Sequence, residues 1–195
     1  GLTEDMLEQY GNGKYGILVD QTSGTHISNN WIAANHMDGI RLVGGSSFLN
    51  KIEKNKIGMS LAGPAPNHHH GIGIYDDAHD NDIGRDFDQA YANYVAFNGW
   101  SGVVVVNTPL CGNNFIGTNI ILSNQYYGIH IRESPSNRIL SNTIVGNGLS
   151  GMSAGVRIEN QHPILSDLSD HNLIKNNTIS GNARLGIELV GDANA

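Results

Sequence analysis

The chain has 195 residues, of which 25 are glycine and 15% are charged, and its formal net charge is −7. This charge argues against a nucleic-acid partner, because phosphates need a basic surface. No apolar run approaches the length of a membrane-spanning helix, and the one cysteine, Cys111, cannot form an internal disulfide. Abundant glycine and few charges predict many short strands joined by tight turns.

The first residues predict a cap. Residues 3–10 read as one short helix, with Thr3 as the N-cap and Met6, Leu7 and Tyr10 on one face. We expect this helix to cover the first unit of a repeat that begins at Gly16. The chain is therefore divided into an N-terminal cap, residues 1–15, and a repeat domain, residues 16–195.

The repeat is a glycine followed by alternating aliphatic residues. This four-residue motif starts at positions 16, 39, 71, 102, 128, 155 and 186, as in Gly-Ile-His-Ile and Gly-Val-Arg-Ile. Side chains alternate along a strand, so the first and third residues after the glycine point inward and the second points outward. A unit that recurs in this way predicts a solenoid whose coils bury a shared core.

Asparagines recur between these motifs in columns, which we expect at the corners of the coils. Asparagine tolerates left-handed backbone, and its amide can bond to the equivalent amide one coil away. The structural ladder predicted at the middle corner is Asn30, Asn55, Asn93, Asn119, Asn142 and Asn177. A column before it reads Thr25, Asn50, Asn81, Asn114, Asn137 and Asn172. A column after it reads Asn35, Ser60, Asn98, Asn124, Asn147 and Asn182.

These motifs resemble right-handed parallel β-helix proteins, the fold shared by pectate lyases, alginate epimerases, phage tailspikes and many bacterial surface proteins. The resemblance covers residues 16–190 and is nearest to the generic repeats of large secreted or surface proteins. It implies an all-β, single-domain parallel β-helix of about seven coils and a secreted or cell-surface location. It specifies activity poorly, since function lies in sites that are grafted onto folds.

The leading interpretation is an extracellular β-solenoid with a structural, adhesive or assembly role. No cap follows Gly186, so we expect the C-terminal coil to present an unpaired edge. Either the chain is part of a longer solenoid, or this edge pairs end to end with another copy. The sequence favours a role without catalysis, because it lacks a convergent acid/base set.

An alternative is a carbohydrate-binding or polysaccharide-active module. Insertions at 62–70, 148–154 and 161–168 flank two of the glycine motifs and would wall a groove over the outward strand face. The resemblance implies that this face carries sugar-binding and catalytic residues, in which case the chain is a lyase, an epimerase or a glycoside hydrolase. The candidate residues are Tyr75, His130, Arg132, Arg157, Glu159 and Glu188.

Within this set, His130 or Glu159 is the candidate base and Arg157 the charge-stabilising cation. A structural interpretation stays open, in which Arg132–Glu159 and Arg157–Glu188 are cross-strand charge pairs. The aromatic residues able to stack on sugar rings are Trp31, Trp100, Tyr126 and Tyr127.

A second alternative is a metal-binding module in the loops of residues 68–88, and otherwise no cofactor is expected. The candidate ligands are His68, His70, Asp77 and His79, which suit a transition metal, while the aspartates alone suit calcium. A strand separates the two histidine groups, and aspartate is common in turns. "DAHD" at 77–80 resembles the Asp-Pro-His-Asp motif of mannuronan epimerases, with Ala78 in place of proline, but its register puts it in a corner.

Overall fold

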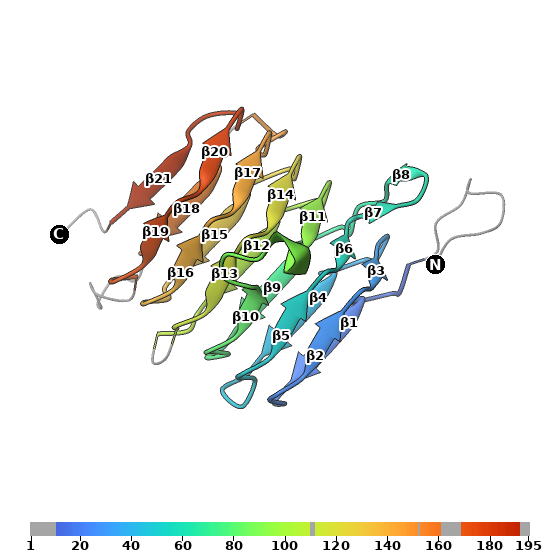
Figure 1. Ribbon diagram of the computed structural model, residues 1–195, viewed down its shortest axis with the longest axis horizontal. Coiled ribbons are helices and arrows are strands. Elements are labelled where there is room, and N and C mark those ends of the chain that lie inside the picture. Colours follow the sequence, from blue (N-terminus) through green and yellow to red (C-terminus); the bar gives the residue numbers. More distant parts are fainter. Residues whose placement is uncertain (1–10, 110–111, 152, 161–168, 192–195) are drawn as a thin grey trace.

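The computed structural model describes residues 11–109, 112–151, 153–160 and 169–191. The predicted cap helix and the insertion at 161–168 lie outside these residues. The described chain winds into a parallel β-helix whose coils follow one another from β1 to β21 along the long axis (Figure 1). Six coils each give one strand to each of three sheets, and a seventh strand, β21, completes the first sheet.

The three sheets correspond to the three straight segments of each coil. The groove sheet contains β1 (Ile17–Asp20), β4 (Ile40–Val43), β9 (Ile72–Tyr75), β12 (Val103–Val106), β15 (Ile129–Arg132), β18 (Val156–Glu159) and β21 (Ile187–Val190). The second sheet contains β2 (His26–Ser28), β5 (Lys51–Glu53), β10 (Asp82–Gly84), β13 (Phe115–Gly117), β16 (Arg138–Leu140) and β19 (Leu173–Lys175). The third sheet contains β3 (Trp31–Ile32), β6 (Lys56–Ile57), β11 (Tyr94–Ala96), β14 (Ile120–Leu122), β17 (Thr143–Val145) and β20 (Thr178–Ser180).

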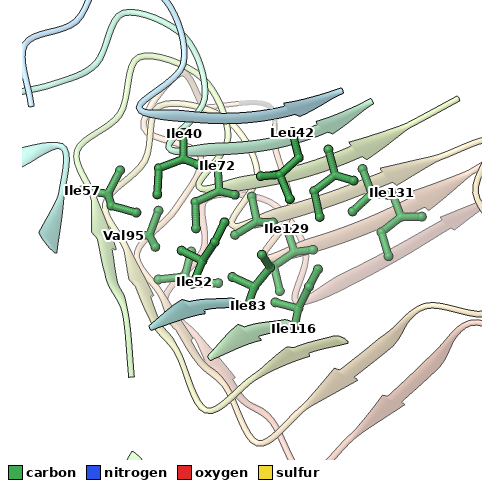
Figure 2. Close-up of a cluster of buried hydrophobic side chains, with 14 of the residues drawn as sticks. Ile40, Leu42, Ile52, Ile57, Ile72, Ile83, Val95, Ile116, Ile129 and Ile131 are labelled. Atoms are coloured by element: carbon green, nitrogen blue, oxygen red, sulfur yellow. The ribbon is translucent and has the colours of Figure 1, made fainter. Parts of the chain in front are cut away.

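The core is one narrow column of aliphatic side chains. Ile72, Val103 and Ile129 are register partners on successive strands of the groove sheet, and all three are fully buried. Each such side chain contributes about 1.5–3 kcal/mol to folding. Figure 2 shows side chains from all three sheets meeting in this interior, among them Ile40, Leu42, Ile52, Ile57, Ile83, Val95 and Ile116. The predicted all-β parallel solenoid is confirmed.

The asparagine ladders hold the corners. Asn119 illustrates the pattern: its backbone N–H and its Nδ2 both donate to Oδ1 of Asn142 (2.9 and 3.1 Å), and its Nδ2 also donates to the Ile83 carbonyl (2.8 Å). Asn93 donates to Asn119 in the same way. These bonds satisfy polar groups that the tight corners would otherwise bury unpaired. The two predicted columns that begin at Thr25 and Asn30 are confirmed.

The third column was predicted wrongly at one position. Asn35 donates to Asn67 and Asn67 donates to Asn98, so Asn67, not Ser60, belongs to this ladder. The cause is a small hairpin, β7 (Met59–Ser60) with β8 (Gly63–Pro64), which projects from the coil stack (Figure 1). The chain returns to the coil at Ala65, whose N–H donates to the Gly58 carbonyl (3.1 Å).

The left-handed backbone expected of the asparagines belongs to their neighbours. Lys54, Thr118 and Ser141 have φ values of 59°, 59° and 57°, and each precedes a ladder asparagine. No ladder asparagine in the described chain has a positive φ. The asparagine therefore supplies hydrogen bonds while the residue before it makes the turn.

Short connections leave almost no helix. The one helical element in the described residues is a 3₁₀ turn, η1 (Gln89–Tyr91), in the insertion that follows β10. No helix in this part of the chain is long and apolar enough to cross a membrane.

Candidate functional site

A groove of about 540 Å³ lies over the outward face of the groove sheet. Its floor comes from outward positions of four neighbouring strands, and its wall comes from the corner residues just before these strands. The floor consists of Arg41, Tyr75, Val104, Val106, His130 and Arg132. The wall consists of Met37, His69, His70, Trp100, Ser101, Tyr126 and Tyr127.

At one end of the groove, a buried carboxylate organises the floor. Asp38 is 1% exposed and accepts hydrogen bonds from Arg41 Nη1, Tyr75 Oη and the His70 backbone N–H, all at 3.2 Å. Burial raises the pKa of Asp38, and the three hydrogen bonds act in the opposite direction. The Arg41 guanidinium lies over the Tyr75 ring at 3.8 Å, which favours cation–π attraction.

A glycine lets this arrangement form. The Tyr75 ring folds back over Gly73 on its own strand, where an added Cβ would lie 2.2 Å from Tyr75 Cε2. Asp38 and Gly73 together therefore hold Tyr75 and Arg41 flat against the sheet.

The wall is a row of neighbouring aromatic rings. His69 stacks on Trp100 with ring centroids 4.7 Å apart and planes 15° apart, and Tyr126 follows at 6.3 Å from Trp100. Trp100 and Tyr126 are nearly half exposed. These two half-exposed rings give a ligand ring aromatic surface to stack on.

At the other end, an ion-pair cluster surrounds Glu159. His130 Nε2 lies 2.9 Å from Glu159 Oε1, and Arg157 Nε donates to Glu159 Oε2 at 2.7 Å. Arg157 Nη1 also donates to Glu188 Oε2 at 2.7 Å. Burial raises the pKa of Glu159, but the hydrogen bonds from His130 and Arg157 outweigh it and lower this pKa to about 2. Glu159 therefore stays ionised and orients the imidazole of His130, whose ring packs on Tyr127 at 4.8 Å.

Arg132 differs from the other charged residues of this face. Its Nε is buried and has no hydrogen-bond partner, and none of the ion pairs found among the described residues includes it. The expected Arg132–Glu159 pair is not formed, because Glu159 is held by His130 and Arg157. The expected Arg157–Glu188 pair is present.

The charge of the groove opposes the charge of the chain. Two guanidinium groups and three imidazoles line it, whereas its described lining residues include no carboxylate. Arg41 and His130 are paired with Asp38 and Glu159, so Arg132 is the lining cation that no described carboxylate pairs, and it suits an anionic ligand.

Of the six candidate carbohydrate-binding residues, the structure brings Tyr75, His130 and Arg132 into the groove. The other three, Arg157, Glu159 and Glu188, lie beside it in the ion-pair cluster. Of the four aromatic candidates for sugar stacking, Trp100, Tyr126 and Tyr127 line the wall, while Trp31 lies on the outer face of the third sheet.

Sequence reasoning missed Asp38, Arg41 and His69 as site residues. Asp38 and His69 lie in the corner segments just before a glycine motif, and four such segments build the wall or support the floor. A comparison of the residues before each glycine, coil by coil, would have revealed this wall.

The four candidate metal ligands are spread over different surroundings. His68 stacks on His36, His70 lies in the groove wall, and His79 stacks on Phe48 with its Nδ1 2.8 Å from the Asp77 carbonyl. Within the described residues, no three His, Cys, Asp or Glu side chains lie close enough to hold a metal ion together. Metal binding stays a prediction that elemental analysis would test.

Comparison with known proteins assigns the family. Residues 15–195 match the model of the right-handed β-helix region. With the coil architecture above, this match shows that the chain belongs to the right-handed β-helix family. A comparison with curated protein sequences gave no match.

Solved structures show the same fold. A mutant of the periplasmic alginate epimerase AlgG aligns with a TM-score of 0.65 and 21% identity, over 92% of this chain and 36% of the epimerase. The A-modules of two Azotobacter vinelandii mannuronan C-5 epimerases, AlgE6 and AlgE4, align with TM-scores of 0.60 and 0.62 and identities of 19% and 17%. They are covered to 50% and 53%, over 93% and 92% of this chain. The chain thus spans about a third to a half of the length of these structures.

Proposed function

We propose that the groove binds an anionic polysaccharide of the uronate class. The observation that carries this proposal is Arg132, a guanidinium that lines the groove and forms no ion pair with any described residue. A cation in a partly apolar hollow is stabilised by a counter-charge. Carboxylates suit a guanidinium best, because they accept its N–H groups in a fork geometry.

The shape and lining of the groove support a sugar as the carrier of that carboxylate. Trp100 and Tyr126 offer half-exposed rings, while Val104 and Val106 give the floor an apolar centre. Such a mixture of rings and few polar groups is typical of small-molecule sites. The similar structures named as alginate epimerases support uronates as the class. The proposal includes a location outside the cytoplasm, which the periplasmic name of one neighbour supports.

The proposal extends to proton transfer at the bound sugar. Glu159 holds His130 through Nε2, so the base of this pair is His130 Nδ1 on the other side of the ring. A base beside a carboxylate-binding arginine can remove the proton on the carbon next to a uronate carboxylate, whose developing charge Arg132 would stabilise. Loss of the glycosidic oxygen from the neighbouring ring carbon, with a proton from water, would give an unsaturated sugar. Return of a proton from water to the opposite face of the ring would give an epimer.

Binding is tested by titration calorimetry with alginate and polygalacturonate, with dextran as the neutral polymer. We expect binding of the polyuronates alone, and a loss of about tenfold or more in affinity for Arg132→Gln. Arg138→Gln is the matched control, since Arg138 lies on the second sheet outside the groove. Equal affinity for dextran, or equal losses in both variants, would refute the proposal. Formation of unsaturated products, followed by their ultraviolet absorbance, tests the catalytic extension.

A second candidate is association through the last described coil. Leu185, Ile187 and Leu189 are 41%, 44% and 70% exposed there, and β19, β20 and β21 are the last strands of their sheets. Open strand edges and exposed aliphatic side chains favour pairing with another chain. Sedimentation at rising protein concentration tests this candidate: association that Leu189→Lys abolishes would support it, and a monomer throughout would exclude it.

A further inference from the structure

His70 occupies a special place in the groove wall. It is 8% exposed, its backbone N–H donates to Asp38 Oδ1, and its Nδ1 accepts the backbone N–H of Ser101, both at 3.2 Å. The Trp100 ring lies perpendicular to it, with centroids 5.2 Å apart. The imidazole is thus held at Nδ1 and packed against Trp100, while Asp38 holds the backbone of the same residue.

These contacts determine which ring nitrogen carries the proton. A backbone N–H only donates, so Nδ1 must present its lone pair to Ser101. Burial lowers the pKa of His70 to about 3, and the positive groups that face it, His130, His69 and Arg41, act in the same direction. At neutral pH the ring is therefore uncharged, with its one proton on Nε2.

Nε2 is left for a ligand. It has no hydrogen-bond partner among the described residues, and it keeps some accessible surface on a residue that lines the groove. The groove thus holds two kinds of donor: the charged guanidinium of Arg132 and the neutral, rigid N–H of His70.

We propose that His70 is a specificity-determining residue, whose Nε2–H donates to an uncharged oxygen, a hydroxyl, of the saccharide that Arg132 binds by its carboxylate. This inference rests on the proposed function. Mannuronate, galacturonate and glucuronate share the configuration of the carbon that carries the carboxylate and differ in the orientation of their hydroxyls, whereas guluronate differs from mannuronate at the carboxylate-bearing carbon itself. An arginine that binds the carboxylate does not distinguish the first three, whereas one fixed donor does, because an epimer with its hydroxyl turned away leaves that donor unpaired.

The test compares two substitutions of His70. Asparagine keeps an acceptor near the Nδ1 position for Ser101 but has no donor near Nε2. Glutamine has a longer side chain that reaches the Nε2 position with an N–H. Dissociation constants are measured by calorimetry for oligomers of mannuronate, guluronate, galacturonate and glucuronate.

We expect wild-type protein to prefer one epimer by about tenfold. In His70→Asn the preferred oligomer loses about that factor, and the constants for the mannuronate, galacturonate and glucuronate oligomers come within about threefold of one another. His70→Gln retains part of the preference. The midpoint of urea unfolding shows whether each variant is folded.

The outcomes separate the two proposals. Polyuronate binding without any preference among epimers in wild-type protein, or an unchanged preference in folded His70→Asn, overturns the role of His70 and leaves the proposed function standing. No polyuronate binding by wild-type protein overturns both. If His70→Asn does not fold, the wild-type preference and His70→Gln decide.

Discussion

The corners of the coils and the outward face of the groove sheet are both columns of stacked residues, but they treat polar atoms in opposite ways. In a corner ladder asparagine returns at nearly every coil, and most of its Oδ1 atoms accept two hydrogen bonds from the coil before, as Asn142 does from Asn119. On the groove face the residue changes from coil to coil, from Arg41 through Gly73 and Val104 to His130. There, the buried Nε of Arg132 has no hydrogen-bond acceptor among the described residues.

The difference separates structure from site. Stacked strands are about 4.8 Å apart, so a repeated amide meets its own partner automatically and stabilises the fold. Where the residue changes from coil to coil, this hydrogen bond between identical amides cannot form, and polar groups become available to a ligand. Substitutions in ladders should therefore affect stability, and substitutions on the groove face should affect binding.

The largest expected effect is on stability, from Asn119→Ala in the middle of a ladder. Removing this buried side chain leaves the two N–H groups of Asn93 without their acceptor and the Ile83 carbonyl without the side-chain donor. Oδ1 of Asn142 then keeps only the backbone N–H of residue 119 as a donor. We expect a loss of about 3–4 kcal/mol in the free energy of unfolding, measured by urea titration.

Asn177→Ala is the matched control for this ladder. Asn177 accepts from Asn142 but lies in the last described coil and is only partly buried. We expect a loss of about half as much. Equal losses at the two positions would show that ladder continuity contributes little.

Arg132→Gln should weaken ligand binding without weakening the fold. Ligand affinity should fall about tenfold or more, whereas the free energy of unfolding should stay about the same, because no ion pair found among the described residues is lost and the glutamine amide takes the place of Nε. Thermal unfolding without ligand measures the second quantity. A loss of stability comparable with that of Asn119→Ala would mean that Arg132 is structural, like the ladders.

The same contrast explains what the sequence predicted. Repeating features were readable: the groove-sheet register and two ladders follow from spacing alone. Ser60 was mistaken for Asn67 because a hairpin shifts the count inside one coil. Arg132 was assigned to Glu159 because they are register partners, whereas the competing donors on His130 and Arg157 take that carboxylate. Such competition between neighbouring side chains depends on their conformations, which register does not determine.

The ion pairs of Glu159 should make the free energy of unfolding depend on pH. The expected effect is smaller than those of Asn119→Ala and Arg132→Gln. The pKa of Glu159 falls from its ordinary 4.5 to about 2 in the folded protein, so its ionised form stabilises the fold. This contribution is complete above pH 4.5 and disappears as the pH falls toward 2. Glu159→Gln lacks it, so the stability difference between wild-type and variant should be largest above pH 5 and shrink below pH 4. Urea titrations at pH 3 and pH 6 measure it, and a difference independent of pH would contradict the ion-pair account.

The smallest expected effect tests how the floor of the groove is held. In Gly73→Ala the new methyl group would lie 2.2 Å from Tyr75 Cε2, so the ring must tilt away. Tyr75 Oη would then move from Asp38, and the Arg41 guanidinium would lose the ring beneath it. We expect polyuronate affinity to fall about threefold.

The second sheet supplies a matched control for this substitution. The ring of Phe115 lies over Gly117 in the same way, with an added Cβ 2.0 Å from the ring, but away from the groove. In Gly117→Ala the Phe115 ring must tilt away, as the Tyr75 ring must in Gly73→Ala. This should lower the free energy of unfolding and leave polyuronate affinity unchanged. If both alanines weaken binding equally, the effect travels through the scaffold and Tyr75 has no local role. If Gly73→Ala alone weakens it, the floor is a positioned part of the site.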